Sequence, residues 1–432
     1  MTIRPGRTWA AAAVALVCAS VALLQADAGR AASSVSFGVQ DDAWLLYGPG
    51  TLDSRLDELE RLGVDIVRFT IRWDRVAKSR PANPRNPRDA AYDWSSVDSV
   101  LNGLRRRGIA VVVTLYGTPS WANGGRSANW APTSDRSLAN FAYAAVNRYS
   151  WIQYWTIWNE PNQPAWLRPT SAGVYVRKLL NPAYAQIHAV IPSARIGGGM
   201  TGPRAGSGVS PVAWIRAMGA ADALLDAYAH HPYPNRPRSE TPWGPTCARC
   251  STISMAELER LQKEVHRSFG PTRLWLTEYG YQTNPPDTYF GVSPATQAEY
   301  VATAARRVYL AEHVDMLIYF LVRDDSADEG WQSGLYTSDG EEKPSYTAFR
   351  LPLTQASRDG TRTVVWGQIR PRSGSQPYRL RTSENGHWSW VGGTRWTDRR
   401  GFLTVTLRAP AGSLVHIWSP RDAASSLAVR IR

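Results

Sequence analysis

Ile152-Gln153-Tyr154-Trp155-Thr156-Ile157-Trp158 is an apolar run that ends in Asn159-Glu160-Pro161. A second apolar run, Leu274-Trp275-Leu276-Thr277, ends in the same way, in Glu278-Tyr279-Gly280. Both runs have the short length and the aromatic and β-branched content that are typical of buried strands. Each run therefore predicts a strand that carries a glutamate at its C-terminal end.

Similar strand-like runs alternate with amphipathic stretches between residues 35 and 350, as in the helical spacing of leucines over Leu52–Leu62. Eight-fold alternation of this kind predicts a (β/α)8 barrel. A doubly wound sheet is the alternative, but no glycine-rich phosphate-binding turn follows the first strand. The expected strands are Ser36–Gln40, Ile66–Trp73, Ala110–Tyr116, Ile152–Trp158, Arg195–Met200, Leu224–His230, Arg273–Thr277 and Met316–Leu321.

The C-terminal part of the chain has a different pattern. Residues 33–352 are expected to form the barrel and residues 353–360 a short linker. Residues 361–432 contain short alternating strands separated by Gly, Pro and Asn turns, which predicts a small antiparallel β-sandwich domain. An accessory role for this domain, associated with carbohydrate through Trp388, Trp390 and Trp396, is one interpretation, and a spacer packed on the barrel is the other.

Residues 1–32 are expected to be a secretory signal peptide. Arg4 and Arg7 precede an apolar, alanine-rich run, and small residues suitable for cleavage follow at positions 26–28 and 30–32. The apolar run is short for a transmembrane anchor, which is the alternative. No later segment is long and apolar enough to span a membrane, so we expect a secreted protein with a signal of about residues 1–28 or 1–32.

Cys247 and Cys250 are the two cysteines outside the expected signal peptide, and they lie in a loop rich in Pro, Gly and Arg. In a secreted protein this C-x-x-C pair predicts a small loop-closing disulfide. A zinc site would need two further ligands, and no second C-x-x-C or H-x-x-x-H pair exists, so we expect no metal site. A thioredoxin-like redox pair would open a helix directly after a strand, and we do not favour that interpretation for this loop.

The formal net charge of the 432 residues is +13, and much of it lies in the C-terminal domain. Residues 361–432 hold twelve arginines and no lysine, against the acids Glu384, Asp398 and Asp422. Such a charge would attract an anionic polymer, for example an acidic polysaccharide. The simpler interpretation, which we favour, is a solvated arginine-rich surface. Nucleic-acid binding is not expected because no recognised motif accompanies the charge.

The two strand-terminal glutamates would meet at one face, because the C-terminal ends of barrel strands converge there. Glycoside hydrolysis uses such a pair, with the carboxyl groups about 5–5.5 Å apart in retaining enzymes and about 6.5–9.5 Å apart in inverting ones. One carboxyl group must hold a proton while the other stays ionised. The amide of Asn159 could hydrogen-bond a sugar 2-hydroxyl. This chemistry requires no cofactor.

Trp158-Asn159-Glu160-Pro161 followed by Glu278-Tyr279-Gly280 resembles the pattern of glycoside hydrolase clan A. The resemblance covers about residues 35–350 and extends to the cellulase-like family five and the xylosidase-like family thirty-nine. In that clan the acid/base ends the fourth barrel strand and the nucleophile ends the seventh. The resemblance therefore implies a retaining β-glycosidase of a poly- or oligosaccharide, with Glu160 as acid/base and Glu278 as nucleophile.

Further positions agree with this resemblance. Arg68 stands where the clan carries an arginine near the nucleophile, and His231-Pro232-Tyr233 matches its His/Tyr position. Such a tyrosine would hydrogen-bond the nucleophile and keep it ionised. His230 and His231 are adjacent, so only one can face inward, and His231 is our candidate. Thr118-Pro119-Ser120-Trp121 resembles family thirty-nine.

Sugar-stacking aromatic residues are expected at Trp121, Trp166 and Trp331. The eighth strand of the clan often ends in a tryptophan that floors the sugar, whereas this chain reads Tyr319-Phe320-Leu321. Either Phe320 substitutes for that tryptophan, or Trp331 reaches in from the following loop.

Two other functions fit the same pattern. A non-catalytic carbohydrate-binding protein on a decayed barrel is one, although a binding protein would need neither glutamate. A transglycosylase using the same site with a sugar acceptor is the other. Sugar specificity depends on the loops around the site. Residues 79–94 are expected to form a long loop on the active face, and residues 234–252 form a second insertion. These two segments could build either a cleft or a pocket.

Overall fold

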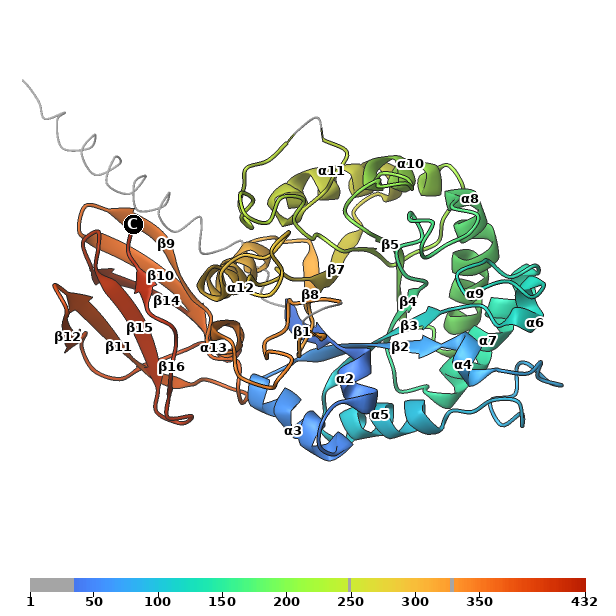
Figure 1. Ribbon diagram of the computed structural model, residues 1–432, viewed down its shortest axis with the longest axis horizontal. Coiled ribbons are helices and arrows are strands. Elements are labelled where there is room, and N and C mark those ends of the chain that lie inside the picture. Colours follow the sequence, from blue (N-terminus) through green and yellow to red (C-terminus); the bar gives the residue numbers. More distant parts are fainter. Residues whose placement is uncertain (1–34, 248–249, 327–329) are drawn as a thin grey trace, which may run out of the picture.

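The structure is a computed structural model that describes residues 35–247, 250–326 and 330–432. The predicted signal peptide lies outside these residues. No helix in the described part of the chain combines the length and apolarity needed to cross a membrane. Figure 1 shows a barrel followed by a smaller unit of strands at the C-terminal end.

Eight parallel strands close into the predicted barrel in the order β1 to β8, and β1 pairs with β8 to complete it. The (β/α)8 prediction is therefore confirmed (Figure 1). The predicted runs differ from the strands only at their ends. The strands are β1 (Ser36–Gln40), β2 (Ile66–Arg72), β3 (Ala110–Tyr116), β4 (Tyr154–Ile157), β5 (Arg195–Thr201), β6 (Ala227–His230), β7 (Arg273–Tyr279) and β8 (Val314–Phe320).

Helices follow the strands around the barrel, and several begin at a serine or threonine whose side chain accepts a hydrogen bond from the first turn, as Thr51 does for α3. Proline at the first helical position, after a serine cap, starts α10 and α12. The outer helices are α3 (Leu52–Leu62), α5 (Ser95–Arg106), α7 (Asp135–Arg148), α8 (Ala172–Tyr175), the π-helix η1 (Val176–Leu180), α9 (Asn181–Val190), α10 (Pro211–Gly219), η2 (Met255–Glu257), α11 (Leu258–Phe269) and α12 (Pro294–Tyr309).

The barrel interior changes from apolar to polar along the strands. Near the N-terminal ends it is filled by buried side chains such as Ile66 and Trp275. Two residues further along β2, Arg68 points the same way, because side chains alternate between the two faces of a strand. The interior thus places a buried guanidinium at the level of the strand ends that carry the glutamates.

The C-terminal unit is the predicted antiparallel β-sandwich. One sheet has the strand order β14-β10-β9 and the other contains β12-β11-β15-β16. Leu380, Val405 and Ile417 are among the buried side chains between them. The strands are β9 (Leu353–Asp359), β10 (Arg362–Gln368), β11 (Pro377–Glu384), β12 (His387–Trp390), β13 (Arg395–Trp396), β14 (Phe402–Arg408), β15 (Leu414–Ser419), β16 (Ala424–Ser425) and β17 (Val429–Arg430).

The prediction that residues 353–360 form a linker is wrong. Residues 353–359 are strand β9, which pairs antiparallel with β10 along most of its length. The barrel ends with α13 (Pro344–Arg350), and the sandwich begins almost directly after it. The polar, alternating composition of the segment misled the prediction, because β9 is an edge strand with several exposed side chains.

The two units share a continuous core. Trp366 of β10 and Phe402 of β14 pack on Tyr309 of α12, with ring centroids 5.3 and 4.6 Å from that tyrosine. Arg370 is buried against Phe37 and Phe349 of the barrel. Because these contacts are aromatic and largely buried, the sandwich is expected to fold as one body with the barrel.

The Trp366→Ala substitution should lower the free energy of unfolding by about 3–5 kcal/mol, because it removes a large side chain that is 2% exposed in the aromatic cluster of the interface. Guanidinium titration followed by circular dichroism would measure the loss. Trp396, 60% exposed, is the matched control, and its alanine variant should stay within about 0.5 kcal/mol of the parent. Equal stability of the two variants would contradict the shared core.

Candidate active site

Glu160 follows β4 in a sharply turned segment. Trp158 and Glu160 have φ angles of 74° and 34°, a region that costs non-glycine residues of order 1–3 kcal/mol each. The turn is held by the indole of Trp158, which donates to the carbonyl of Trp166 at 2.7 Å. It is also held by Asn162, whose Oδ1 accepts from the backbone of Gly202 at 2.9 Å.

Gly202 lies directly against the carboxyl group of Glu160. A Cβ atom at this position would come within 2.8 Å of Cδ of Glu160, so the residue after β5 must be glycine if the carboxyl group is to keep its place. The surrounding backbone therefore fixes the direction in which Glu160 points into the barrel mouth.

Glu278 is the penultimate residue of β7 and is 9% exposed. Its Oε1 accepts from Arg68 at 2.5 Å and its Oε2 accepts from the hydroxyl of Tyr233 at 3.0 Å. The two donors bind different oxygens, so each oxygen of the carboxylate accepts a hydrogen bond that fixes its orientation. Tyr233 is 5% exposed and follows β6 through His231 and Pro232.

Arg68 links four other strands to β2. Its guanidinium donates to Gln40 at the end of β1, to Thr114 of β3, to Asn159 after β4 and to Glu278 of β7. Because arginine can only donate, the atom of Asn159 that it contacts at 2.7 Å is the amide oxygen. The amide nitrogen of Asn159 is then left for the cleft, where a substrate hydroxyl would lie.

The adjacent histidines have separate surroundings. Nδ1 of His231 lies 2.9 Å from Oε1 of Glu160 and 3.5 Å from Oε2 of Glu278, so this ring stands between the two carboxyl groups. His230 points into the protein, where it contacts Thr201 and the carbonyl of Ile253. Burial lowers the pKa of His230 to about 3, so this residue stays neutral and supports the fold.

The electrostatics favour an ionised Glu278. Burial raises its pKa, but the charges of His231 and Arg68, with the hydrogen bonds from Arg68 and Tyr233, outweigh burial and leave the pKa below its ordinary value. Burial and the nearby charges of Glu278 and Glu160 raise the pKa of Tyr233 well above its ordinary value, so Tyr233 remains a donor. The carboxylate is therefore available as an anion at neutral pH.

One oxygen of Glu160, one of Glu278 and one nitrogen of His231 all lie within 4.8 Å of one another. Three such atoms could in principle ligate a metal ion. Here the guanidinium of Arg68 already neutralises Glu278, and a divalent cation beside it would be repelled. The donor set therefore suits proton transfer and nucleophilic attack better than metal binding.

A cleft of about 840 Å³ lies above the two carboxyl groups. Trp331 lines it and stacks on Tyr233, with ring centroids 5.3 Å apart, while Phe320 meets Trp331 edge to face at 5.7 Å. Both candidates for the sugar floor are thus present together. Trp166 also lines the cleft and is 37% exposed. These aromatic faces are suited to the apolar face of a sugar ring.

Trp121 does not line the cleft. Its ring packs edge to face on Trp73, and its indole nitrogen donates to the carbonyl of Ala77 at 2.8 Å. Trp121 therefore packs against the short helix α4 (Trp73–Val76) and not on the cleft. Residues 79–94 lie between β2 and α5, so they are a βα loop as predicted, but neither they nor the described residues of 234–252 line the cleft.

Sequence reasoning did not find Gln40 and Asp42, which line the cleft from the end of β1. Gln40 accepts from Arg68 at 2.5 Å, and Asp42 accepts from the backbone of Thr70 at 3.1 Å. Burial raises the pKa of Asp42, against the hydrogen bonds from Thr70 and the charge of Arg68. Their position just after the first barrel strand was the available signal.

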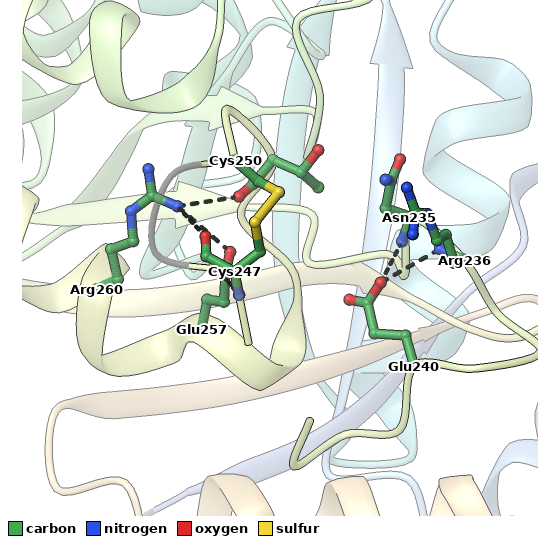
Figure 2. The surroundings of a disulfide bond; sticks show 8 residues. Asn235, Arg236, Glu240, Cys247, Cys250, Glu257 and Arg260 are labelled. Atoms are coloured by element: carbon green, nitrogen blue, oxygen red, sulfur yellow. Dashed lines mark hydrogen bonds and ion pairs between the residues drawn. A yellow bond between two sulfur atoms is a disulfide. The ribbon is translucent and has the colours of Figure 1, made fainter. Parts of the chain in front are cut away.

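The predicted disulfide joins Cys247 and Cys250 (Figure 2). The backbone nitrogen of Cys247 donates to Glu257 at 2.8 Å, and Arg260 donates to the carbonyl of Cys247 at 3.3 Å. Glu257 and Arg260 belong to η2 and the first turn of α11, so these contacts tie the loop after β6 to the outer layer. The disulfide lies apart from the cleft lining.

A parallel eight-stranded barrel that brings two strand-terminal glutamates into one aromatic cleft is the framework of a glycoside hydrolase. Residues 83–349, more than half of the chain, match the family described as the glycosyl hydrolase catalytic core. The chain belongs to this family. No curated protein sequence matches it significantly.

Solved structures agree with the fold. A family 39 glycoside hydrolase from the gut symbiont Bacteroides cellulosilyticus WH2 is 18% identical with a TM-score of 0.58, over 88% of this chain and 80% of that one. A glucosidase from Croceicoccus marinus is 14% identical with a TM-score of 0.58, over 90% and 95%. A bifunctional glucanase-xylanase from a metagenome library is 13% identical with a TM-score of 0.53, over 90% and 96%.

The Tyr233→Phe substitution should shift the acidic limb of the kcat/KM profile to higher pH. Glu278 must be ionised to act, and loss of the hydroxyl donor raises a pKa that the native contacts hold low. Activity would then disappear at a higher pH than in the parent as the pH falls. We also expect kcat/KM to fall roughly 10- to 100-fold, as for loss of a hydrogen bond to a charged group.

Tyr116→Phe is the control, because Tyr116 lines the same cleft, whereas the side-chain donors to Glu278 among the described residues are Arg68 and Tyr233. Its acidic limb should match the parent. An unmoved limb in Tyr233→Phe, with activity lowered, would show that Tyr233 acts on substrate and not on Glu278.

Proposed function

We propose that this protein is a secreted, retaining β-glycoside hydrolase that cleaves a poly- or oligosaccharide by double displacement. The observation that carries the proposal is the pair of carboxyl groups, whose nearest oxygens lie within 4.8 Å. A close approach of this kind supports a retaining pair, because the carboxyl groups of inverting enzymes are about 6.5–9.5 Å apart. Secretion rests on the basic and apolar sequence of residues 1–32.

In the first step Glu278 attacks the anomeric carbon while Glu160 protonates the departing oxygen. Glu278 is suited to attack because Arg68 and Tyr233 hold it as an oriented anion. As the new bond forms, the negative charge of Glu278 is lost. The glycosidic electron pair leaves with the departing oxygen, which takes the proton of Glu160 and becomes a neutral hydroxyl.

In the second step Glu160 is ionised and removes a proton from water, whose oxygen attacks the anomeric carbon and releases Glu278. The same carboxyl group thus serves as acid and then as base. His231 lies 2.9 Å from Glu160 and keeps it oriented through both steps. The amide nitrogen of Asn159 is positioned for the sugar 2-hydroxyl, a contact that strengthens in the transition state.

The intact network around Glu278 favours catalysis over a purely binding role. A carbohydrate-binding protein would not need a buried arginine that donates to the nucleophile, because a buried charge pair is costly to maintain without a function. The aromatic residues Trp331, Phe320 and Trp166 supply binding surface in addition to the catalytic pair.

Incubation with a panel of 2-deoxy-2-fluoro glycosyl fluorides, followed by intact-protein mass spectrometry, tests the mechanism. The fluorine slows the second step, so the glycosyl-enzyme accumulates. We expect a mass gain of one sugar that peptide mapping assigns to Glu278, and the reactive sugar names the glycone. An adduct on another residue would reject Glu278 as the nucleophile, and the Glu278→Gln variant is the control that should stay unlabelled.

The Glu160→Ala substitution should abolish cleavage of substrates with poor leaving groups but spare the first step for aryl glycosides with very acidic phenols, which need no protonation. Added azide should restore turnover of those aryl glycosides and yield the β-glycosyl azide, detected by NMR. Equal loss on both substrate types, without azide rescue, would contradict the acid/base role of Glu160.

A further inference from the structure

The outer face of the second sandwich sheet carries an array of aromatic and cationic side chains. In β11 the residues Leu380 and Thr382 are buried toward the other sheet, so Arg379 and Arg381 point outward. The strand pairing extends this outward face to the strands on both sides of β11. The partners of the outward β11 positions are Trp390 and Trp388 on β12, Trp396 on β13, and His416 and Trp418 on β15.

The aromatic rings and guanidinium groups of this face stack on each other. Arg379 lies 3.9 Å from the ring centroid of Trp390, and Arg381 lies 5.0 Å from the same ring and 5.5 Å from that of Trp388. These stacks hold the long arginine side chains against the sheet. Their charges therefore have fixed positions beside the rings.

The face is open to solvent. Trp388, Trp390 and Trp396 are 38%, 43% and 60% exposed, although large apolar side chains at the surface of a soluble protein are usually scattered singly. In Figure 1 the β12–β11–β15 sheet lies on the side of the sandwich away from the barrel, whereas β9 and β10 face α12. Apart from the arginines that stack on them, these rings remain open to solvent.

The charge of the face selects the class of ligand. Residues 361–432 hold three acids, and two of them are engaged elsewhere, since Asp422 binds Arg372 and Ser419 and Asp398 accepts from backbone nitrogens of its own turn. Glu384 lies at the end of β11 in the register that faces the other sheet. None of the three acids of residues 361–432 therefore lies among the outward positions of β11 or their strand partners.

From this face we propose a second, non-catalytic binding site for an acidic polysaccharide, a chain of sugar rings that bear carboxylate groups. The tryptophan rings stack on the apolar faces of the pyranose rings, and Arg379 and Arg381 pair with the carboxylates. Adjacent strands lie about 4.8 Å apart, so rings and charges alternate across the sheet over distances comparable to one sugar residue.

Such a site would hold the barrel close to its polymer. Two sites on one rigid chain raise the effective concentration of substrate at the cleft without any new contact in the cleft itself. The proposal does not depend on the catalytic assignment, because binding by the outer face is measured without turnover. The cleft is compatible with the same polymer, since Arg75 and Arg204 line it and form no ion pair with the described residues.

Affinity gel electrophoresis of the full chain carrying Glu278→Gln tests the site, with polygalacturonate in the gel as the anionic probe. We expect strong retardation by polygalacturonate and little by the same polymer after reduction of its carboxyl groups. The double substitution Trp388→Ala/Trp390→Ala should weaken retardation about tenfold, as for loss of aromatic anchors in a binding surface. Arg379→Gln/Arg381→Gln should also weaken it, and the difference from the parent should shrink with added salt, because salt screens the charge attraction that this variant lacks.

Matched controls separate the site from the general positive charge of the protein. Trp243 of the barrel unit is 41% exposed and carries Arg307 at 4.6 Å from its ring, so Trp243→Ala removes a similar stack elsewhere. Arg106→Gln/Arg136→Gln removes the same charge from exposed helix positions. Both controls should migrate like the parent, and polyglutamate, an anion without rings, should retard the parent far less than polygalacturonate does.

Retardation unchanged in Trp388→Ala/Trp390→Ala, or reduced equally by the Arg106→Gln/Arg136→Gln control, would overturn the proposal and assign the attraction to net charge alone. Equal retardation by polyglutamate would do the same. Circular dichroism of each variant must match the parent, and Trp388→Phe/Trp390→Phe, which keeps a ring at both positions, should retain most of the binding.

Discussion

The buried ion pair between Arg68 and Glu278 is the constraint on which the site depends. It joins β2 to β7 across the barrel, and the same guanidinium also binds Gln40, Thr114 and Asn159. A guanidinium in this interior is tolerable only with all its donors occupied, because an unpaired buried charge is very costly. The polar upper layer of the barrel supplies acceptors for every donor nitrogen of Arg68. The same hydrogen bonds orient Asn159 and Glu278.

The two glutamates differ because their surroundings differ. Glu278 is nearly buried, and the charges of His231 and Arg68, with the hydrogen bonds from Arg68 and Tyr233, lower its pKa despite burial. Glu160 is more exposed, and its carboxyl group lies within hydrogen-bond distance of Nδ1 of His231. The contacts of Glu278 therefore favour its anionic form.

The two sheets of the sandwich have different surroundings. Its first sheet joins the barrel through Trp366 and Phe402, and its second sheet turns an aromatic and cationic face to solvent. A spacer would need only the first face. The arginine excess noted in the sequence is thus partly structural, as at buried Arg370, and partly concentrated where tryptophans are exposed.

The sequence by itself determined the barrel, its eight strands and the position of Glu160 and Glu278 at strand ends, because strand periodicity and strand-end position are local properties of the chain. Arg68, His231 and Tyr233 were candidates through the resemblance to clan A, and the structure brings them into contact with the two glutamates. Tertiary structure alone decided that Trp121 packs beside Trp73, that Trp331 reaches Tyr233, and that residues 353–359 pair as a strand. These outcomes depend on loop paths and on partners distant in sequence, so no local pattern encodes them.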